Sequence, residues 1–249
     1  EGKASISATL DFKPMSSALS RTRAAGDALK GINSLHILLY DHSTKKLINS
    51  WEIEEYSVSD EKRDDTNAEN GNSAETSTKR ATFKLPEEIN FGKYYMYAVA
   101  NIPDLLTNTA YSDAIQTIDE LKSIPLTWDS ENVTNNGQMI GFFTKSSVPA
   151  LSADDESLVV NEKSIKLHAW LRRAASKVTV AYDGSALKEG VFIYLQSVQI
   201  KDIPLQCYLG KENNVGKEGY TLDVPETGPD MIDGEIITFY YLQFFFLNN

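Results

Sequence analysis

The stretch Ala4-Ser-Ile-Ser-Ala-Thr-Leu-Asp-Phe12 decides the fold class. Apolar residues occupy every second position in it, and serine, threonine or aspartate occupy the positions between them. This period is typical of a β-strand with one buried face, because successive side chains of a strand point to opposite sides. We therefore predict a strand over residues 4–12 that buries the side chains of Ile6, Ala8, Leu10 and Phe12.

Similar runs follow along the chain. They indicate strands at residues 32–40, 47–56, 81–85, 94–100, 139–143, 165–171, 178–182 and 191–200. One helix is also predicted, with Ser112 or Thr109 as its N-cap, from apolar residues at spacings of three and four: Tyr111, Ala114, Ile115, Ile118 and Leu121. Many short strands with a single helix indicate an all-β protein built of β-sandwiches in series.

Two domains are expected, at residues 1–150 and 157–249, on either side of the acidic segment 151–156. In the first domain, residues 57–80 form a long polar stretch in which Val58 is the one large apolar residue. We expect this stretch to be a mobile insertion, because it brings almost no apolar surface to a core.

The residues that follow the first strand are small and polar from Lys13 to Gly31. They include Arg21 and Arg23 in the sequence Ser-Arg-Thr-Arg-Ala-Ala-Gly. Arginines flanked by small residues in an exposed linker are readily cut by proteases, so we expect this linker to be a cleavage site.

The composition excludes several classes of function. A formal net charge of −11 argues against nucleic acid or an anionic membrane as the main partner, because both need a basic face. No phosphate-binding loop, paired-histidine zinc motif or Gly-x-Ser-x-Gly motif occurs in the sequence. We therefore predict no catalytic, cofactor-binding or metal-binding residue, and we do not expect an enzyme.

A few residues that could carry chemistry have a simpler explanation. The acidic clusters Asp64-Asp65 and Asp154–Glu156 lack the alternating ligand spacing of a calcium loop, so solvated loop charge is favoured. His168 lies on the polar face of a predicted strand, where a ligand role is the less favoured alternative. Cys207 is the single cysteine, and we predict a buried structural thiol there.

Four segments of the chain carry a resemblance to one family. The segment Leu171-Arg-Arg-Ala-Ala-Ser-Lys-Val178 is similar to a Leu-x-Arg-x-x-Ala-Lys-Val strand, although Ser176 stands where alanine is usual. The other three segments are Tyr97–Leu105, Gln138–Gly141 and Val198–Pro204. In their order and spacing, the four segments resemble the fimbrillin family of Bacteroidales, the subunits of type V pili. The resemblance covers most of residues 1–210.

The resemblance implies two transthyretin-like β-sandwich domains in tandem, with the short helix in the first. It implies a structural or adhesive subunit of a cell-surface pilus (fimbria), made as a lipoprotein precursor at the outer membrane. An arginine-specific maturation protease would remove the first strand by cutting after Arg23 or, as the second choice, Arg21. A strand of another pilus subunit would then replace the contacts of the displaced strand by donor-strand exchange.

The same resemblance bears on the two ends of the chain. A signal peptide and a lipidated cysteine are absent from this sequence, so we expect a mature fragment. The second domain is shorter than is usual in the family, which implies either a shortened C-terminal domain or a C-terminal assembly device that differs from the family's. Host glycans or host proteins are further partners that the resemblance implies.

Two other functions remain as alternatives. The first is a non-polymerising surface adhesin, tip or anchor protein that binds glycan or host protein, which the shortened C-terminal domain favours. The second is a hydrolase on a β-sandwich scaffold, which would need two carboxylates about 5–10 Å apart in a cleft.

Overall fold

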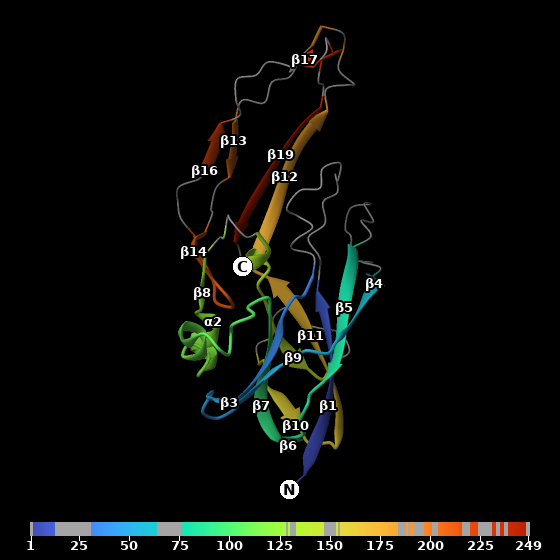
Figure 1. Ribbon diagram of the computed structural model, residues 1–249, viewed down its shortest axis with the longest axis vertical. Helices are drawn as coiled ribbons and strands as arrows, with labels where there is room; N and C mark the ends of the chain where they lie inside the picture. The colour runs from blue at the N-terminus through green and yellow to red at the C-terminus, as the bar shows by residue number, and fades with distance from the viewer. Residues whose placement is uncertain are drawn as a thin grey trace.

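The computed structural model describes most of the chain. The described residues are 2–12, 31–63, 76–127, 129, 133–146, 153, 155–183, 188, 190–191, 197–200, 204–215, 220–223, 231–232, 235–236 and 239–247. Strands dominate this part of the chain, and its helices are short, so the all-β prediction is confirmed (Figure 1).

Ten strands form one hydrogen-bonded sheet in the order β3-β2-β7-β9-β11-β1-β5-β4, with β10 added to β7 and β6 added to β1. Their bounds are β1 (Lys3–Phe12), β2 (Leu35–Asp41), β3 (Leu47–Glu52), β4 (Ser57–Arg63), β5 (Thr76–Lys84), β6 (Ile89–Asn90), β7 (Gly92–Ala100), β9 (Met139–Thr144), β10 (Leu158–Val160) and β11 (Ser164–Arg173). All neighbours are antiparallel except β1 and β11, which run parallel.

The sheet curves until its two ends share one core, which we call the main core. Buried side chains from β2, β3 and β7 pack there with those from β1, β5 and β11. Strand β9 joins the two groups of strands, because it pairs with β7 on one side and with β11 on the other. The main core therefore lies inside the curve, and it includes apolar side chains from strands at both ends of the sheet.

Two short helices cover the outer face of β2, β7 and β9. Helix α1 (Thr109–Ser112) is capped by Asn108, and helix α2 (Ile118–Lys122) is capped by Thr117. Their apolar residues form a second core with Tyr40 and Tyr97, which we call the helix-side core. The structure thus corrects both the single predicted helix and its predicted N-cap.

The backbone at Thr117 explains the break between the two helices. Thr117 is extended (φ −131°, ψ 160°) and forms a β-bridge with Lys46, in the turn between β2 and β3. The Leu47 amide also donates to the Gln116 carbonyl at 2.9 Å. Tertiary hydrogen bonds therefore replace the helical ones at this point, which the apolar spacing alone could not indicate.

The polar stretch 57–80 is partly strand. Its two ends belong to β4 and β5, which pair antiparallel from Ser57↔Thr82 to Arg63↔Thr76. Strand β4 ends the sheet, and its sequence Asp-Glu-Lys-Arg suits an edge, where charged residues discourage pairing with another chain. Residues 64–75 of the expected insertion lie outside the described part.

Strand pairing connects residues on the two sides of the segment 151–156, which the sequence predicts to separate two domains. Strands β10 and β11 lie beyond residue 157, yet β10 pairs with β7, and β11 pairs with β1 and β9. The strands that pair with residues 1–150 therefore extend to Arg173, and β12 begins at Ala175.

The remaining strands form small sheets. β12 (Ala175–Asp183) pairs with β19 (Phe239–Leu247), β13 (Ser197–Ile200) with β16 (Tyr220–Asp223), and β17 (Met231–Ile232) with β18 (Glu235–Ile236). β14 (Pro204–Tyr208) lies between β15 (Asn214–Val215) and β8 (Pro125–Leu126), and η2 is a 3₁₀ helix at Val133–Asn136. Cys207 and Leu209 join the helix-side core.

Candidate functional site

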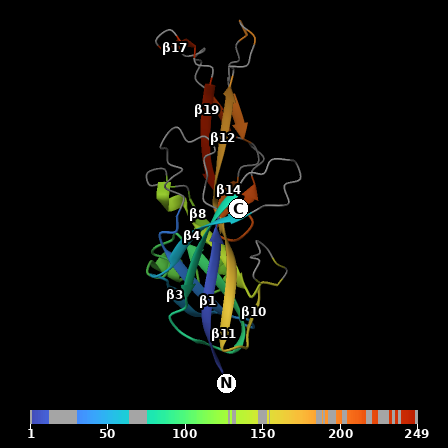
Figure 2. The ribbon, with the colours of Figure 1, turned by 90° about the vertical axis from the view of Figure 1, so that its right-hand side faces the viewer.

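Strand β1 is an interior strand of the sheet although it lies near the start of the chain. It pairs in parallel with β11 from Ser5↔Ser164 to Phe12↔Leu171, and antiparallel with β5 from Ser7↔Lys84 to Phe12↔Lys79. Both ribbon views show β1 lying beside β11 (Figures 1 and 2). We call the space that β1 fills between β5 and β11 the β1 slot.

The inner face of β1 contributes directly to the main core. Every second side chain is buried, at 4% exposed or less, in a set that comprises Ala4, Ile6, Ala8, Leu10 and Phe12. The four residues singled out in the sequence therefore lie in the core. Loss of β1 would expose this part of the core to water and would leave backbone groups of β5 and β11 unpaired.

An ion pair holds β1 in register on its β5 side. Asp11 is 3% exposed, and its carboxylate accepts hydrogen bonds from Arg80 Nε at 2.7 Å and Nη2 at 3.1 Å. Asp11 and Arg80 are also cross-strand partners in the ladder. A two-point contact of this kind depends on position, so a slip of one residue in register would break it.

The chain is anchored again at Gly31, where the linker after β1 ends. Asn101 has a left-handed backbone (φ 65°), and its side-chain amide donates to the carbonyls of Gly31 at 3.0 Å and Gly137 at 2.7 Å. Its side-chain oxygen accepts from the Asn33 amide at 2.7 Å. Both ends of residues 13–30 are therefore attached to the folded sheet. Arg21 and Arg23 lie between them, outside the described residues.

Gly141 in β9 lets the wall of the β1 slot form. A Cβ atom at this position would lie 2.3 Å from the Trp170 carbonyl oxygen of β11. The two strands are paired on either side of this point, at Ala169↔Phe143 and Arg172↔Ile140. Only glycine permits such a close backbone approach, which gives a physical reason for the glycine in the Gln138–Gly141 segment.

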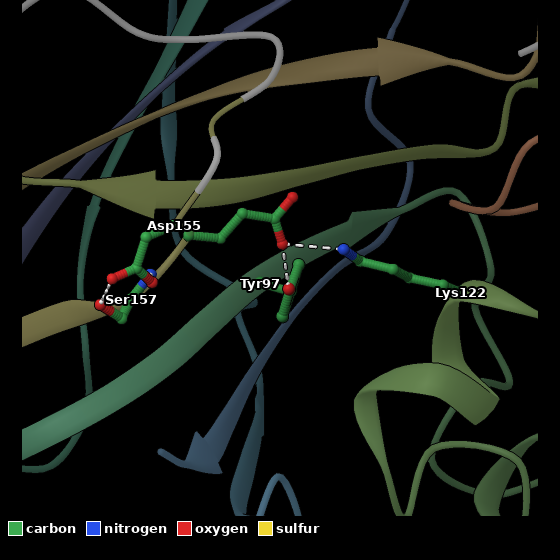
Figure 3. A network of polar contacts seen from close by, with 5 residues as sticks. Tyr97, Lys122, Asp155 and Ser157 are labelled. Atoms are coloured by element: carbon green, nitrogen blue, oxygen red, sulfur yellow. Dashed lines mark hydrogen bonds and ion pairs between the residues drawn. The ribbon is translucent and has the colours of Figure 1, made fainter. Parts of the chain in front are cut away.

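Another polar site lies on the outer face of the sheet, at Tyr97 of β7 (Figure 3). The Glu156 carboxylate accepts a hydrogen bond from the Tyr97 hydroxyl and another from Lys122 Nζ at 2.8 Å. Lys122 also lies over the Tyr97 ring, 5.3 Å from its centroid. Beside them, Ser157 Oγ donates to Asp155 at 2.8 Å. These contacts tie residues 155–157 to β7 and α2.

The electrostatics of this second site favour a structural or binding role. Burial, followed by the contact with Glu156, raises the pKa of Tyr97, so its hydroxyl stays protonated and acts as a donor. The adjoining pocket has a volume of about 240 Å³. It is lined by Tyr97, Lys122, Glu156, Trp170, Arg172 and Glu212, together with small and apolar residues.

The other candidate residues lie apart from the β1 slot or outside the described part. His168 is half-buried on the outer face of β11. Cys207 is buried in the helix-side core, where burial raises the pKa of its thiol. Asp64, Asp65 and Asp154 lie outside the described residues, whereas Asp155 and Glu156 make the contacts above. No group of three potential metal ligands occurs in the described part of the chain.

Sequence reasoning missed several of these contacts. Asp11 counts as an outward polar residue in the alternating pattern, and nothing local indicates that Arg80 buries it. Tyr97, Lys122 and Glu156 come from three separate segments. The charge pair on adjacent strands could have been found only if the pairing of β1 with β5 were already known.

No protein-family model and no curated protein matches this chain. Among the described residues, no helix has the length and apolar character needed to cross a bilayer.

Several solved structures are similar to the chain. The tip fimbrial protein Mfa3 from Porphyromonas gingivalis, with a C-terminal truncation, has 16% sequence identity and a TM-score of 0.48 over 98% of this chain and 68% of that chain. A fimbrial assembly protein from Parabacteroides distasonis has 13% identity and a TM-score of 0.46 over 98% and 77% of the two chains. The fimbrial anchor protein Mfa2 from Porphyromonas gingivalis has 14% identity and a TM-score of 0.36 over 99% and 74%.

Proposed function

We propose that this chain is a non-enzymatic structural and adhesive subunit of a cell-surface pilus. In this proposal, proteolysis removes β1, and a strand of another subunit fills the β1 slot. The observation that supports it is the position of β1, which is paired on both sides and has five buried side chains on its inner face. Assembly from a lipoprotein precursor at the outer membrane is part of the same proposal.

The energetics suit an exchange of strands. Burial of the large side chains Ile6, Leu10 and Phe12 is worth roughly 5–9 kcal/mol, at about 1.5–3 kcal/mol for each. An empty slot would forfeit this burial and would present two unpaired strand edges, an arrangement that readily accepts an extended segment. A strand that restores both ladders would dissociate slowly, which suits a fibre under mechanical load.

The linker is suited to the cut. We propose cleavage after Arg23 or, as the second choice, after Arg21, by an arginine-specific protease. The chain that remains after the cut is held at Gly31 by Asn101, so the rest of the sheet keeps its attachment. The released piece would carry β1 together with the linker residues before the cut.

The test is to treat the purified chain with an arginine-specific protease and to determine the new N-terminus. Cleavage after Arg23 followed by growth of polymer in size-exclusion chromatography is the expected result. The variants Arg23→Ala, Arg21→Ala and the double variant assign the site. An intact fold that resists cleavage at both positions, or a cleaved chain that stays monomeric at high concentration, would contradict the proposal.

A second candidate function is a surface adhesin, tip or anchor protein that binds glycan or host protein and does not polymerise. The pocket of about 240 Å³ favours it, because Trp170 lies among charged residues there, as aromatic residues do in many sugar sites. Glycan-array binding that is lost in Trp170→Ala, together with no polymer after cleavage, would support this candidate.

A further inference from the structure

Arg173 has an unusual environment at the end of β11. Its Nε, Nη1 and Nη2 atoms are all buried, and none of them has a hydrogen-bond partner in the part of the chain that the structure describes. Burial also lowers the pKa of the guanidinium to about 10, which leaves it charged at neutral pH. A buried cation with no anion is costly, and proteins nearly always pair such groups.

The guanidinium belongs to the margin of the main core. Side chains alternate along β11, so Arg173 shares a face with Ala169 and Leu171, which are both in that core. Its cross-strand partner on β9 is Met139, another member of the core. Arg172 lies on the opposite face and is exposed.

Arg173 also lies two residues beyond the point on β11 where the pairing with β1 ends. The last residue of β1 is Phe12, which pairs with Leu171, whereas β11 continues for two more residues. The register offset is 171 − 12 = 159, so a strand that continued in the register of β1 would place its residue 14 opposite Arg173. In the sequence, Phe12 is followed by Lys13 and Pro14, and neither side chain carries a carboxylate.

The two arginines of the slot therefore differ. Arg80 receives the carboxylate of Asp11 from β1 itself, with hydrogen bonds of 2.7 and 3.1 Å. Arg173 receives nothing comparable from β1. We propose that Arg173 binds a carboxylate carried by the strand that replaces β1, at the position two residues beyond the one that substitutes for Phe12.

This inference rests on the proposed function and identifies the chemistry of the incoming strand. In the uncleaved chain the unpaired guanidinium weakens the state in which β1 fills the slot. A replacement strand with an aspartate or glutamate at the stated position supplies a charge-assisted pair that β1 lacks. Arg173 thus favours exchange and selects among donor strands.

The experiment uses the full chain after arginine-specific cleavage. Two fluorescent peptides of residues 3–14 with amidated C-termini are compared, one with Pro14→Glu and one with Pro14→Gln, and their affinities and dissociation rates are measured by anisotropy. We expect the glutamate peptide to bind at least tenfold more tightly. The overall charge of −11 would by itself favour the glutamine peptide, so the preference isolates a local contact.

Three variants assign the effect. Arg173→Met and Arg173→Gln should abolish the preference for the glutamate peptide, whereas Arg172→Met, on the exposed face, should keep it. In the uncleaved chain, Arg173→Met should unfold at the same temperature as wild type or at a higher one.

The outcomes separate the two proposals. If neither peptide enters the cleaved chain, the proposed strand exchange fails. If both peptides bind with equal affinity, the proposed strand exchange is supported and the proposed role of Arg173 is overturned. If both Arg173 variants lower the unfolding temperature more than Arg172→Met does, the guanidinium has a structural role in the uncleaved chain, and the inference is also overturned.

Discussion

Strands β1 and β19 have similar lengths but different surroundings. β1 has ten residues, and it pairs with β11 in parallel and with β5 in the antiparallel sense. β19 has nine residues and pairs in an unbroken antiparallel register with β12, its one neighbour among the described strands. A strand between two neighbours leaves a slot when it departs, whereas a strand with one neighbour leaves only an edge.

The difference matters for the proposed exchange of strands. A slot constrains an incoming strand on both sides and receives its side chains into an existing core, whereas an edge constrains it on one side. The contacts that hold β1 in the slot would therefore also hold a strand that replaced it. Burial keeps β1 in place, so we expect its release to require a cut in the chain that follows it.

The largest expected effect is the loss of the slot itself. Gly141→Val puts a side chain where a Cβ atom would lie 2.3 Å from the Trp170 carbonyl oxygen, so β9 and β11 must separate. We expect a loss of about 4 kcal/mol in the free energy of unfolding, measured by urea denaturation. Gly31→Val is the matched control, because the nearest atom to its Cβ is 3.9 Å away. Equal losses for the two variants would contradict the role given to Gly141.

The next effect tests the attachment of β1. Leu10→Ala removes a side chain that is fully buried in the main core, and it should cost about 3 kcal/mol of unfolding free energy. Thr9→Ala, one residue away on the other face, should cost less than about 1 kcal/mol. An equal loss of unfolding free energy in Leu10→Ala and Thr9→Ala would contradict the view that β1, unlike β19, is held by burial between two neighbouring strands.

A smaller effect tests the register of β1. Asp11→Asn keeps the size of the side chain but removes the charge that Arg80 contacts at 2.7 Å. We expect a loss of about 1–2 kcal/mol, because Arg80 remains partly solvated. A double-mutant cycle with Arg80→Met measures the coupling directly. A coupling energy near zero would show that the ion pair does not hold β1 in register.

The smallest effect concerns β2, another strand with neighbours on both sides. His36 is 1% exposed there, and burial lowers its pKa below 6.5 against the opposing charges of Glu52 and Asp104. Below pH 6.5 the unfolded chain therefore binds a proton more readily than the folded chain, so stability falls as the pH falls. The slope is at most about 1.4 kcal/mol per pH unit for one proton.

Unfolding free energies measured between pH 7 and pH 5, an interval of roughly two units around this transition, should show the slope in wild type. His36→Gln should flatten it. His42→Gln, at a histidine stacked on Tyr95, serves as the matched variant and should leave the slope in place. Hydrogen exchange at low pH should locate the added opening in β2 rather than in β19.

The inward face of β1 could be predicted because the information is local. The alternation of apolar and polar residues follows from backbone geometry and needs no partner. The neighbours of β1 could not be predicted, because β11 lies more than 150 residues away and parallel pairing has no local signal. The same limit hid the contact of Asp11 with Arg80.

The predictions for the helical region and for the polar stretch 57–80 were wrong for a related reason. Spacings of three and four predicted one helix, but the bridge from Thr117 to Lys46 divides it. The sequence around Ser57 predicted an insertion, but pairing with β5 makes a strand of it. In both places, hydrogen bonds to distant residues outweigh the local preference of the chain.

The sequence by itself determined the all-β class, the buried face of the first strand and the presence of two arginines in the linker that follows. It could do so because strand periodicity and linker composition are properties of contiguous residues. Only the tertiary structure decided that this strand has neighbours on both sides, that Asp11 contacts Arg80 and that no described residue pairs with Arg173. These features depend on which segments, distant in the sequence, become neighbours in the fold. Side-chain burial and charge pairing are determined by those neighbours.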